Sequence, residues 1–191
     1  MSRSITRPSS GQVCGLRSPV RFGGDRSGAS ALEFALVAVP LLLLLFGIFQ
    51  VALIYLGNLA IEGAAAQGAR LIRTGQAQMQ GLNANTFKEK VCEQLPAFLT
   101  CAKLQVDVRR FNNFGSTQLT NPLDDSGNMK SSFSYDPGNA GDVVVVRVFY
   151  AWDVTAEFPS LLNMSNMSGN QRLLMATVAF RNEPYENTSS N

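Results

Sequence analysis

The 191-residue sequence contains no histidine, and this absence excludes a large part of enzyme chemistry. Nucleophilic sites built on Ser–His or Cys–His pairs cannot be assembled, and a metal site would lack the imidazole ligands common in proteins. Charged residues are also scarce, at 16% of the chain against about 25% in a typical soluble domain. We therefore expect a protein that is not an enzyme and that has no cofactor and no bound metal.

Hydrophobic residues make up 46% of the chain, and they are concentrated near its start. Between Phe34 and Ile61 no side chain is charged over 28 residues. About 20 apolar residues cross a bilayer as a helix, whereas core helices of soluble proteins rarely run this long without a polar face. We predict a transmembrane helix over residues 29–61 that continues as a helical stalk over residues 62–82.

Basic residues are concentrated in the first 28 residues, which contain five arginines and one acidic residue. The rest of the chain has 11 basic and 13 acidic residues. An excess of arginine and lysine marks the cytoplasmic side of a membrane protein. Residues 1–28 are therefore predicted to be a cytoplasmic leader, with the remainder outside the cytoplasm. Nothing in this charge distribution indicates a nucleic-acid partner.

Two of the three cysteines, Cys92 and Cys101, lie beyond the apolar run with eight residues between them, while Cys14 lies in the leader. In an extracytoplasmic region such a pair is best read as a disulfide. A metal site is the competing interpretation, but only these two cysteines are present there. The disulfide is favoured, and closing its short loop would stabilise the fold by about 2–3 kcal/mol.

Residues 83–185 have the pattern of a small α+β domain, followed by a polar tail over residues 186–191. One amphipathic helix is predicted, and three segments rich in β-branched or alternating apolar residues predict an antiparallel sheet packed on the long helix. Between the first two strands, Asn112–Gly141 is rich in Asn, Asp, Ser and Gly, which predicts a long, mobile loop. The predicted elements are a helix over Thr86–Leu95 and strands over Lys103–Phe111, Asp142–Asp153 and Leu173–Arg181.

Small residues precede the apolar run, from Gly28 to Ala31, and this order is the reverse of an ordinary secretory signal. Such a signal has an apolar core of about 7–15 residues with its small-residue cleavage site after it. The apolar core here is about twice that length. A conventional signal peptide is therefore a poor description of this segment.

The segments "GASALEFA" (Gly28–Ala35), "PLLLLL" (Pro40–Leu45) and "AAQGAR" (Ala65–Arg70) together resemble the TadE-like proteins of the tight-adherence (Flp) pilus system. The C-terminal "ATVAFRNEPY" (Ala176–Tyr185) resembles the final strand of that family. Gly28, followed by Ala29 and by Glu33 five residues after Gly28, also resembles the processing site of type IV prepilins. The resemblance implies cleavage by a prepilin peptidase between Gly28 and Ala29.

Glu33 has two interpretations. Its carboxylate could simply lie at headgroup level, where the partial positive charge of a helix start favours it. Alternatively, as the pilin resemblance implies, it pairs with the new α-amine of Ala29 in a neighbouring subunit. A carboxylate within hydrocarbon costs several kcal/mol unless it is paired, so burial would require such a partner.

The resemblance implies a minor pilin or pseudopilin with a pilin-like fold, anchored by one span in a bacterial inner membrane with its domain in the periplasm. Its implied partners are the prepilin peptidase, other pilin-like and inner-membrane pilus assembly proteins, and membrane lipid. The alternative is a bitopic periplasmic scaffold that keeps its leader and never enters a filament.

Overall fold

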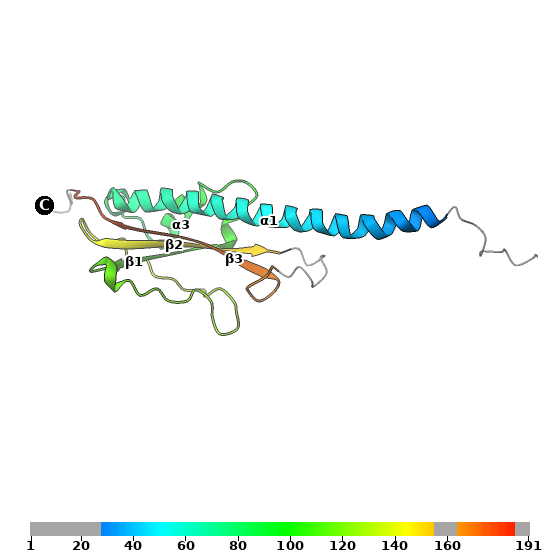
Figure 1. The fold of residues 1–191 in the computed structure, drawn as a ribbon. Helices are drawn as coiled ribbons and strands as arrows, with labels where there is room; N and C mark the ends of the chain where they lie inside the picture. Colours follow the sequence, from blue (N-terminus) through cyan, green and yellow to red (C-terminus); the bar gives the residue numbers. More distant parts are fainter. Residues whose placement is uncertain (1–27, 155–163, 186–191) are drawn as a thin grey trace, which may run out of the picture. The chain divides into compact units, whose positions relative to one another are not determined.

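A computed structural model of the chain describes residues 28–154 and 164–185 (Figure 1). Residues 1–27 of the predicted leader, with Cys14, and the predicted tail (residues 186–191) lie outside the described residues. The chain divides into two units, Met1–Leu44 and Leu45–Asn191. The elements are α1 (Ala29–Arg73), α2 (Gln76–Met79), α3 (Ala84–Cys92), β1 (Leu104–Phe111), β2 (Val143–Asp153) and β3 (Gln171–Arg181), with 3₁₀ turns at Cys101–Lys103 and Phe114–Ser116.

The three strands form one antiparallel sheet in the order β1-β2-β3, and each begins within two residues of its predicted start. The fold is therefore α+β, as predicted, with a long apolar N-terminal helix before a small antiparallel sheet. β2 is the central strand, and its residues Val143–Tyr150 are all buried. Burial on both faces explains why this strand is a continuous run of β-branched and aromatic residues rather than an alternating one.

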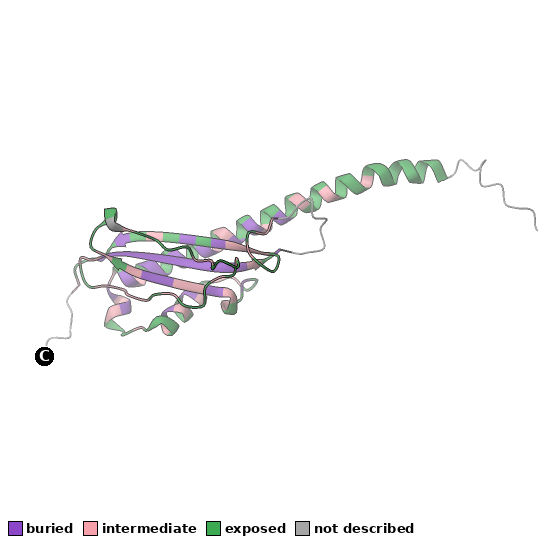
Figure 2. Cartoon of the chain, turned by 90° about the horizontal axis from the view of Figure 1, so that it is seen from below, coloured by how far each residue is buried: buried purple, intermediate pink, exposed green. Residues whose placement is uncertain are grey.

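In the second unit, α3 and the part of α1 from Ile54 onward pack against one face of the sheet (Figure 2). That face is formed by alternate residues of each strand, because successive side chains point to opposite sides of a sheet. The resulting core is almost entirely apolar. Its largest fully buried members from these elements are Ile61, Ile72, Phe87, Val91, Leu104, Val108, Val144, Val146, Val148 and Leu174.

Helix α3 begins two residues earlier than predicted and ends three residues earlier. Asn83 is its N-cap: the side chain accepts the backbone N–H groups of Asn85 and Thr86, and Thr86 reciprocates by accepting the N–H of Asn83. This capping box satisfies amide groups that a helix start leaves unpaired. The helix stops at Cys92, which is joined to Cys101 by a disulfide with a Cα–Cα distance of 5.5 Å.

The polar loop between β1 and β2 is held against the second face of the sheet rather than free of it. A buried ion pair anchors it: Arg147 Nε and Nη2 donate to Asp107 Oδ2 at 3.0 and 2.5 Å. Asp107 Oδ1 accepts the N–H of Ser134 at 2.9 Å, and Arg147 Nη1 donates to the carbonyl of Thr120 at 2.8 Å. Phe133 of the loop also stacks on Phe149 of β2, with ring centroids 5.1 Å apart.

The buried ion pair generates a stability prediction. Asp107→Ala should lower the free energy of unfolding by about 3–5 kcal/mol, because it leaves the buried Arg147 guanidinium without its carboxylate. The double substitution Asp107→Leu/Arg147→Met should recover most of that loss, since it removes both charges. Chemical unfolding of the full-length protein in detergent, followed by circular dichroism, measures both values.

Lys90→Ala is the matched control, because Lys90 forms an ion pair with Glu93 that is exposed to solvent. Exposed pairs contribute about 0–1 kcal/mol. A cost for Asp107→Ala no larger than that of Lys90→Ala would contradict an anchoring role for the buried pair.

Candidate functional site

The residues predicted to form a processing site lie at the very start of α1. Gly28 directly precedes the helix, Ala29 is its first residue, and Glu33 lies one turn further on. All three are exposed. Apart from its chain neighbours and the nearby helix backbone, no described atom lies within 4 Å of the position that a Cβ on Gly28 would occupy. The described residues therefore leave space beside Gly28 at the start of α1.

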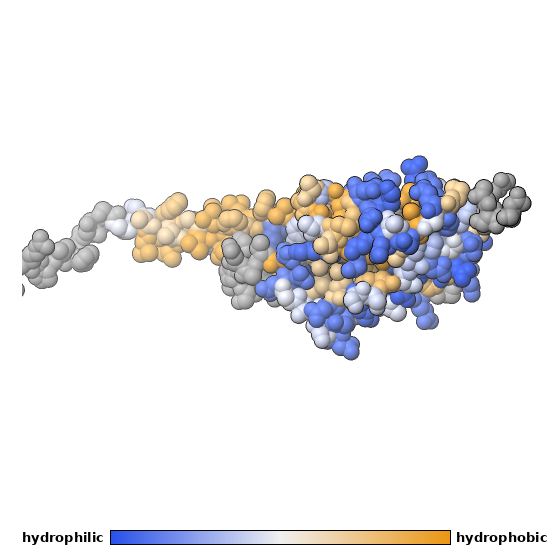
Figure 3. Space-filling view, turned by 180° about the vertical axis from the view of Figure 1, so that it is seen from behind, coloured by the Kyte–Doolittle hydropathy of each residue, from blue (hydrophilic) through white to orange (hydrophobic). Residues whose placement is uncertain are grey.

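Within the described ranges, α1 is the one helix long and apolar enough to cross a bilayer, judged by length and composition. From Ala29 to Phe49 most residues are exposed and none is buried, although the side chains are almost all apolar (Figure 3). Gln50 is the first buried residue of the helix. One apolar N-terminal helix of this kind fits a single-pass membrane anchor.

Beyond Gln50, α1 has one buried face and one exposed face. Small residues on the buried face allow α3 and β3 to approach the helix closely. A Cβ on Gly68 would lie 2.9 Å from Val91 Cγ2 and 3.3 Å from the ring of Phe87, both on α3. A Cβ on Gly57 would lie 3.0 Å from Leu174 of β3. Bulkier residues at these positions would push α1 away from the elements it packs on. Gly63, in contrast, faces outward with nothing within 4 Å.

The small residues between positions 60 and 69 are therefore divided between two faces. Ala64, Ala65, Gly68 and Ala69 are buried in the core, while Gly63 and its neighbours Ala66 and Gln67 are exposed. Packing on the protein's own domain accounts for the first set. The exposed set remains available for contact with another molecule.

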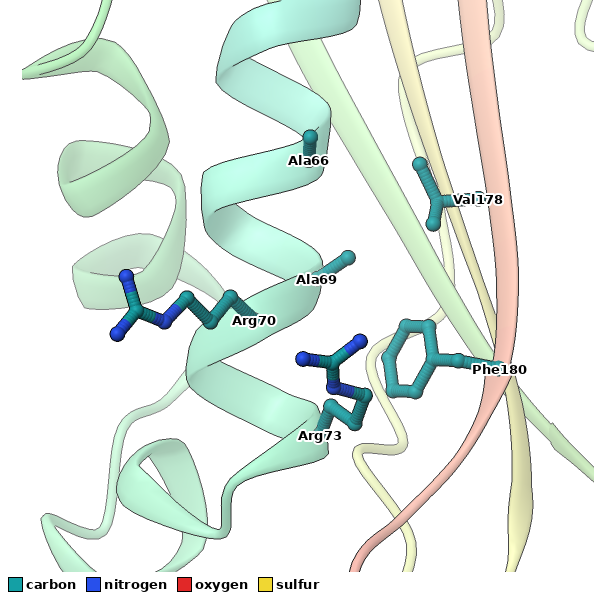
Figure 4. Close-up of a pocket in the computed structure, with 6 residues that line it drawn as sticks. All are labelled: Ala66, Ala69, Arg70, Arg73, Val178 and Phe180. Carbon is teal, nitrogen blue, oxygen red and sulfur yellow. The ribbon is translucent and has the colours of Figure 1, made fainter.

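A groove of about 240 Å³ lies between the C-terminal end of α1 and β3 (Figure 4). Its floor is apolar, formed by Ala66, Ala69, Val178 and Phe180, and the two arginines at its border are Arg70 and Arg73. Arg73 Nε lies 3.3 Å from Glu183 Oε1 in an exposed ion pair.

The segment after β3 fastens the C-terminal end of α1. The N–H of Glu183 donates to the carbonyl of Arg73, and the buried Asn182 side chain donates to the carbonyls of Pro137 and Asn139. Gly75 has a positive φ of 77°, and a Cβ there would collide with the ring of Tyr185. Burial, followed by the nearby Asp142 carboxylate, raises the pKa of Tyr185. The segment "RNEPY" (Arg181–Tyr185) therefore holds the C-terminal end of α1 in place.

The contacts of several buried or half-buried residues could not be predicted from the sequence. Asp107 and Arg147 read as polar interruptions of two strands, yet they are directly opposite each other in the β1–β2 register. Tyr135 lies in the polar loop but packs on Phe87, with ring centroids 5.3 Å apart. Burial raises the pKa of Tyr135 to about 12. Strand register explains the first contact, and the packing of the loop against α3 explains the second.

The segment "LDDSGN" (Leu123–Asn128) forms a turn, and the Asp124 side chain accepts hydrogen bonds from the backbone of the same turn. Asp124 Oδ1 accepts the backbone N–H groups of Ser126 and Asn128 at 3.0 and 2.8 Å. Among the residues that the structure describes, no group of three or more Cys, Asp or Glu side chains could hold a metal ion.

Comparison with known families places the strongest similarity on α1. Residues 28–70 match the family model described as TadE-like protein. The match begins at Gly28 and ends at Arg70, so it confirms the resemblance in the region of "GASALEFA", "PLLLLL" and "AAQGAR". It supports involvement in a tight-adherence pilus system, with other pilus assembly proteins as partners. No curated protein and no solved structure matches.

The two faces of α1 can be separated with a matched pair of glycines. Gly68→Ala should destabilise the full-length protein by about 1–3 kcal/mol, because its Cβ would press on Val91 and Phe87. Gly63→Ala should instead stabilise it by about 0.5–1 kcal/mol, since alanine restricts the unfolded chain and meets no obstacle. Chemical unfolding in detergent gives both values, and equal effects of the two substitutions would refute the assigned orientation of the helix.

Proposed function

We propose, from the TadE-like match of its amino-terminal helix, that this protein is a minor pilin or pseudopilin for assembly of a tight-adherence pilus or a related secretion apparatus. A prepilin peptidase removes the leader after Gly28. The mature protein remains anchored by α1 with its domain in the periplasm, where it meets other pilin-like proteins. The observation that carries this proposal is the position of Gly28 and Ala29 at the exposed start of α1, with space beside Gly28.

Packing among the described residues gives no reason for glycine at position 28. Apart from the chain neighbours and the nearby helix backbone, no described atom lies within 4 Å of the position that a Cβ there would occupy. An enzyme that must approach the backbone closely does give a reason, because a side chain at this position would obstruct it. The glycine is thus explained by a processing partner rather than by packing of the described residues.

Glu33 is exposed on α1, and the structure gives it no ion pair with any described residue. A carboxylate at the membrane boundary is tolerated, but within a bundle of apolar helices it requires a cationic partner. Cleavage after Gly28 would create such a cation, the α-amine of Ala29. We assign Glu33 to pairing with the α-amine of a neighbouring subunit during assembly.

The competing function is a membrane-anchored scaffold that retains its leader. It shares the anchor and the orientation with the pseudopilin, so neither feature distinguishes the two. Cleavage does, because only the pseudopilin loses the five arginines of residues 1–28.

Gly28→Val should abolish processing and leave a full-length precursor in the membrane fraction, because the valine side chain blocks close approach to the bond. Insertion should be unaffected, since the apolar run is unchanged. Mass spectrometry of the intact membrane-extracted protein distinguishes the precursor from a product that begins at Ala29. Gly63→Val is the matched control, an exposed glycine on the same helix whose substitution should leave processing complete.

A product that begins at Ala29 in the Gly28→Val strain would overturn the cleavage site. A wild-type protein that keeps residues 1–28 in the presence of the peptidase would favour the scaffold instead.

Glu33→Gln should leave insertion and cleavage intact but reduce pilus output at least tenfold, because the amide cannot neutralise a neighbouring α-amine. A lost pair in a low-dielectric site costs well over 1.4 kcal/mol, which corresponds to that factor. Glu62→Gln is the control, an exposed glutamate on the same helix. Sheared pili quantified by immunoblotting provide the readout, and normal output from Glu33→Gln would leave Glu33 as a headgroup-level carboxylate.

A further inference from the structure

The position of the domain along α1 can be compared with the thickness of a bilayer. The charge-free run begins at Phe34, directly after Glu33. At 1.5 Å per residue, a hydrocarbon core of about 30 Å accommodates about 20 residues, so the run reaches the far boundary of that core near Leu53. The headgroup layer adds about 5–7 Å, or roughly four residues, which ends near Gly57.

The domain already packs on α1 at residues that lie within the headgroup layer. Ile54 is already 7% exposed and belongs to the core, three positions before Gly57. At Gly57 itself, a Cβ would lie 3.2 Å from Trp152 of β2 and 3.0 Å from Leu174 of β3. The end of the sheet that carries Trp152 is thus packed on the turn of α1 where the headgroup layer falls.

We infer that this end of the domain, the aromatic end, rests in the headgroup layer of the bilayer that α1 crosses and has Trp152 and Phe98 in contact with lipid. The inference rests on the anchoring role of α1 within the proposed function. It adds a second lipid-binding surface, on the folded domain, to the transmembrane helix.

The side chains at the aromatic end have the chemistry of membrane interfaces. Trp152 and Tyr150 are in tilted contact with ring centroids 6.4 Å apart, and Phe98 beside them is 50% exposed while Tyr150 is buried. Tryptophan concentrates at bilayer surfaces because its ring is apolar while its N–H group stays hydrated. These three aromatics line a shallow depression of about 230 Å³ together with Thr100, Lys103 and Asp153.

The charges in this depression compensate each other. Lys103 donates a hydrogen bond to Asp153, which lowers the pKa of that carboxyl, and Gln171 donates a second. The pair is therefore neutral as a unit and polar enough for the headgroup layer. It would not oppose contact with zwitterionic lipid.

The disulfide holds Phe98 at this end. Residues 93–100 form the loop closed by Cys92 and Cys101, and within it Leu99 turns inward and is 6% exposed. The N–H of Thr100 donates to the Tyr150 hydroxyl at 3.2 Å, which ties the loop to β2. Phe98 is left on the outside, next to Trp152.

Lipid, rather than another protein, is the occupant that the surrounding surface favours. On the side of α1 away from the sheet, Tyr55, Leu56 and Leu59 are 64%, 48% and 47% exposed, and the first charge appears at Glu62. This apolar strip is continuous with the transmembrane segment. Tyr55 and Leu56 lie within the headgroup layer, so lipid that covers them reaches the level of Gly57, where Trp152 lies.

Trp152 is the only tryptophan of the chain, so its fluorescence reports this contact directly. The full-length protein is reconstituted into phosphatidylcholine vesicles, and vesicles are collected by flotation. Lipids brominated either near the headgroup or near the end of the acyl chain then serve as quenchers. The shallow label should reduce the emission of Trp152 at least about twofold more than the deep label does.

The double substitution Trp152→Phe/Phe114→Trp is the matched control. Phe114 is 55% exposed and follows the end of β1 that pairs with Val143, at the opposite end of the sheet from Trp152. Its tryptophan should be insensitive to both brominated lipids and accessible to aqueous acrylamide.

Floated protein whose Trp152 is quenched by neither brominated lipid would overturn this inference while leaving the membrane anchor intact. Stronger quenching by the deep label would also overturn it, because the ring would then lie in hydrocarbon. Protein that stays at the bottom of the gradient would refute the anchor, and with it both the inference and the proposed function.

Discussion

The packing of a single helix in two different environments is the constraint on which the rest of this protein depends. From Ala29 to Phe49 α1 is apolar all around and no residue is buried, which suits lipid. From Gln50 onward one face must carry a folded domain. Glycines on that face permit close approach at two levels, Gly57 against β3 and Gly68 against α3. The domain is therefore built on the helix, rather than attached to its end.

A three-stranded sheet has two faces to cover, and the helices cover only one of them. The loop between β1 and β2 lies on the other, anchored by the buried Asp107–Arg147 pair and by Phe133 on Phe149. The pair is costly to desolvate but specific, since Asp107 also accepts hydrogen bonds from the Arg109 side chain and the Ser134 backbone, and Arg147 donates to the Thr120 carbonyl. This arrangement lets a segment with the composition of a flexible linker serve as a structural layer.

The TadE-like similarity covers residues 28–70, which is the helix and not the sheet. The part of the chain that resembles the family is therefore the part that fits a membrane anchor, and the sheet lies outside the match. The groove bordered by Arg70 and Arg73 and the aromatic end around Trp152 lie at opposite ends of the face that packs on α1. Only the aromatic end carries the inferred contact with lipid headgroups.

The long helix, the three strands and their antiparallel arrangement could be predicted from the sequence, because hydrophobic periodicity and turn residues are local signals. The candidate site, Gly28, Ala29 and Glu33, is a prediction from a short motif, and the structure adds that the described residues leave space for a side chain at position 28. The sequence did not indicate which elements pack on α1, or at which residue of the helix this packing begins. Ile54 and Leu56 are similar apolar residues of the same turn, yet one is 7% exposed and the other 48%. Only the position of the sheet decides between them. The same holds for Asp107 and Arg147, since partners 40 residues apart meet only when strand register brings them together.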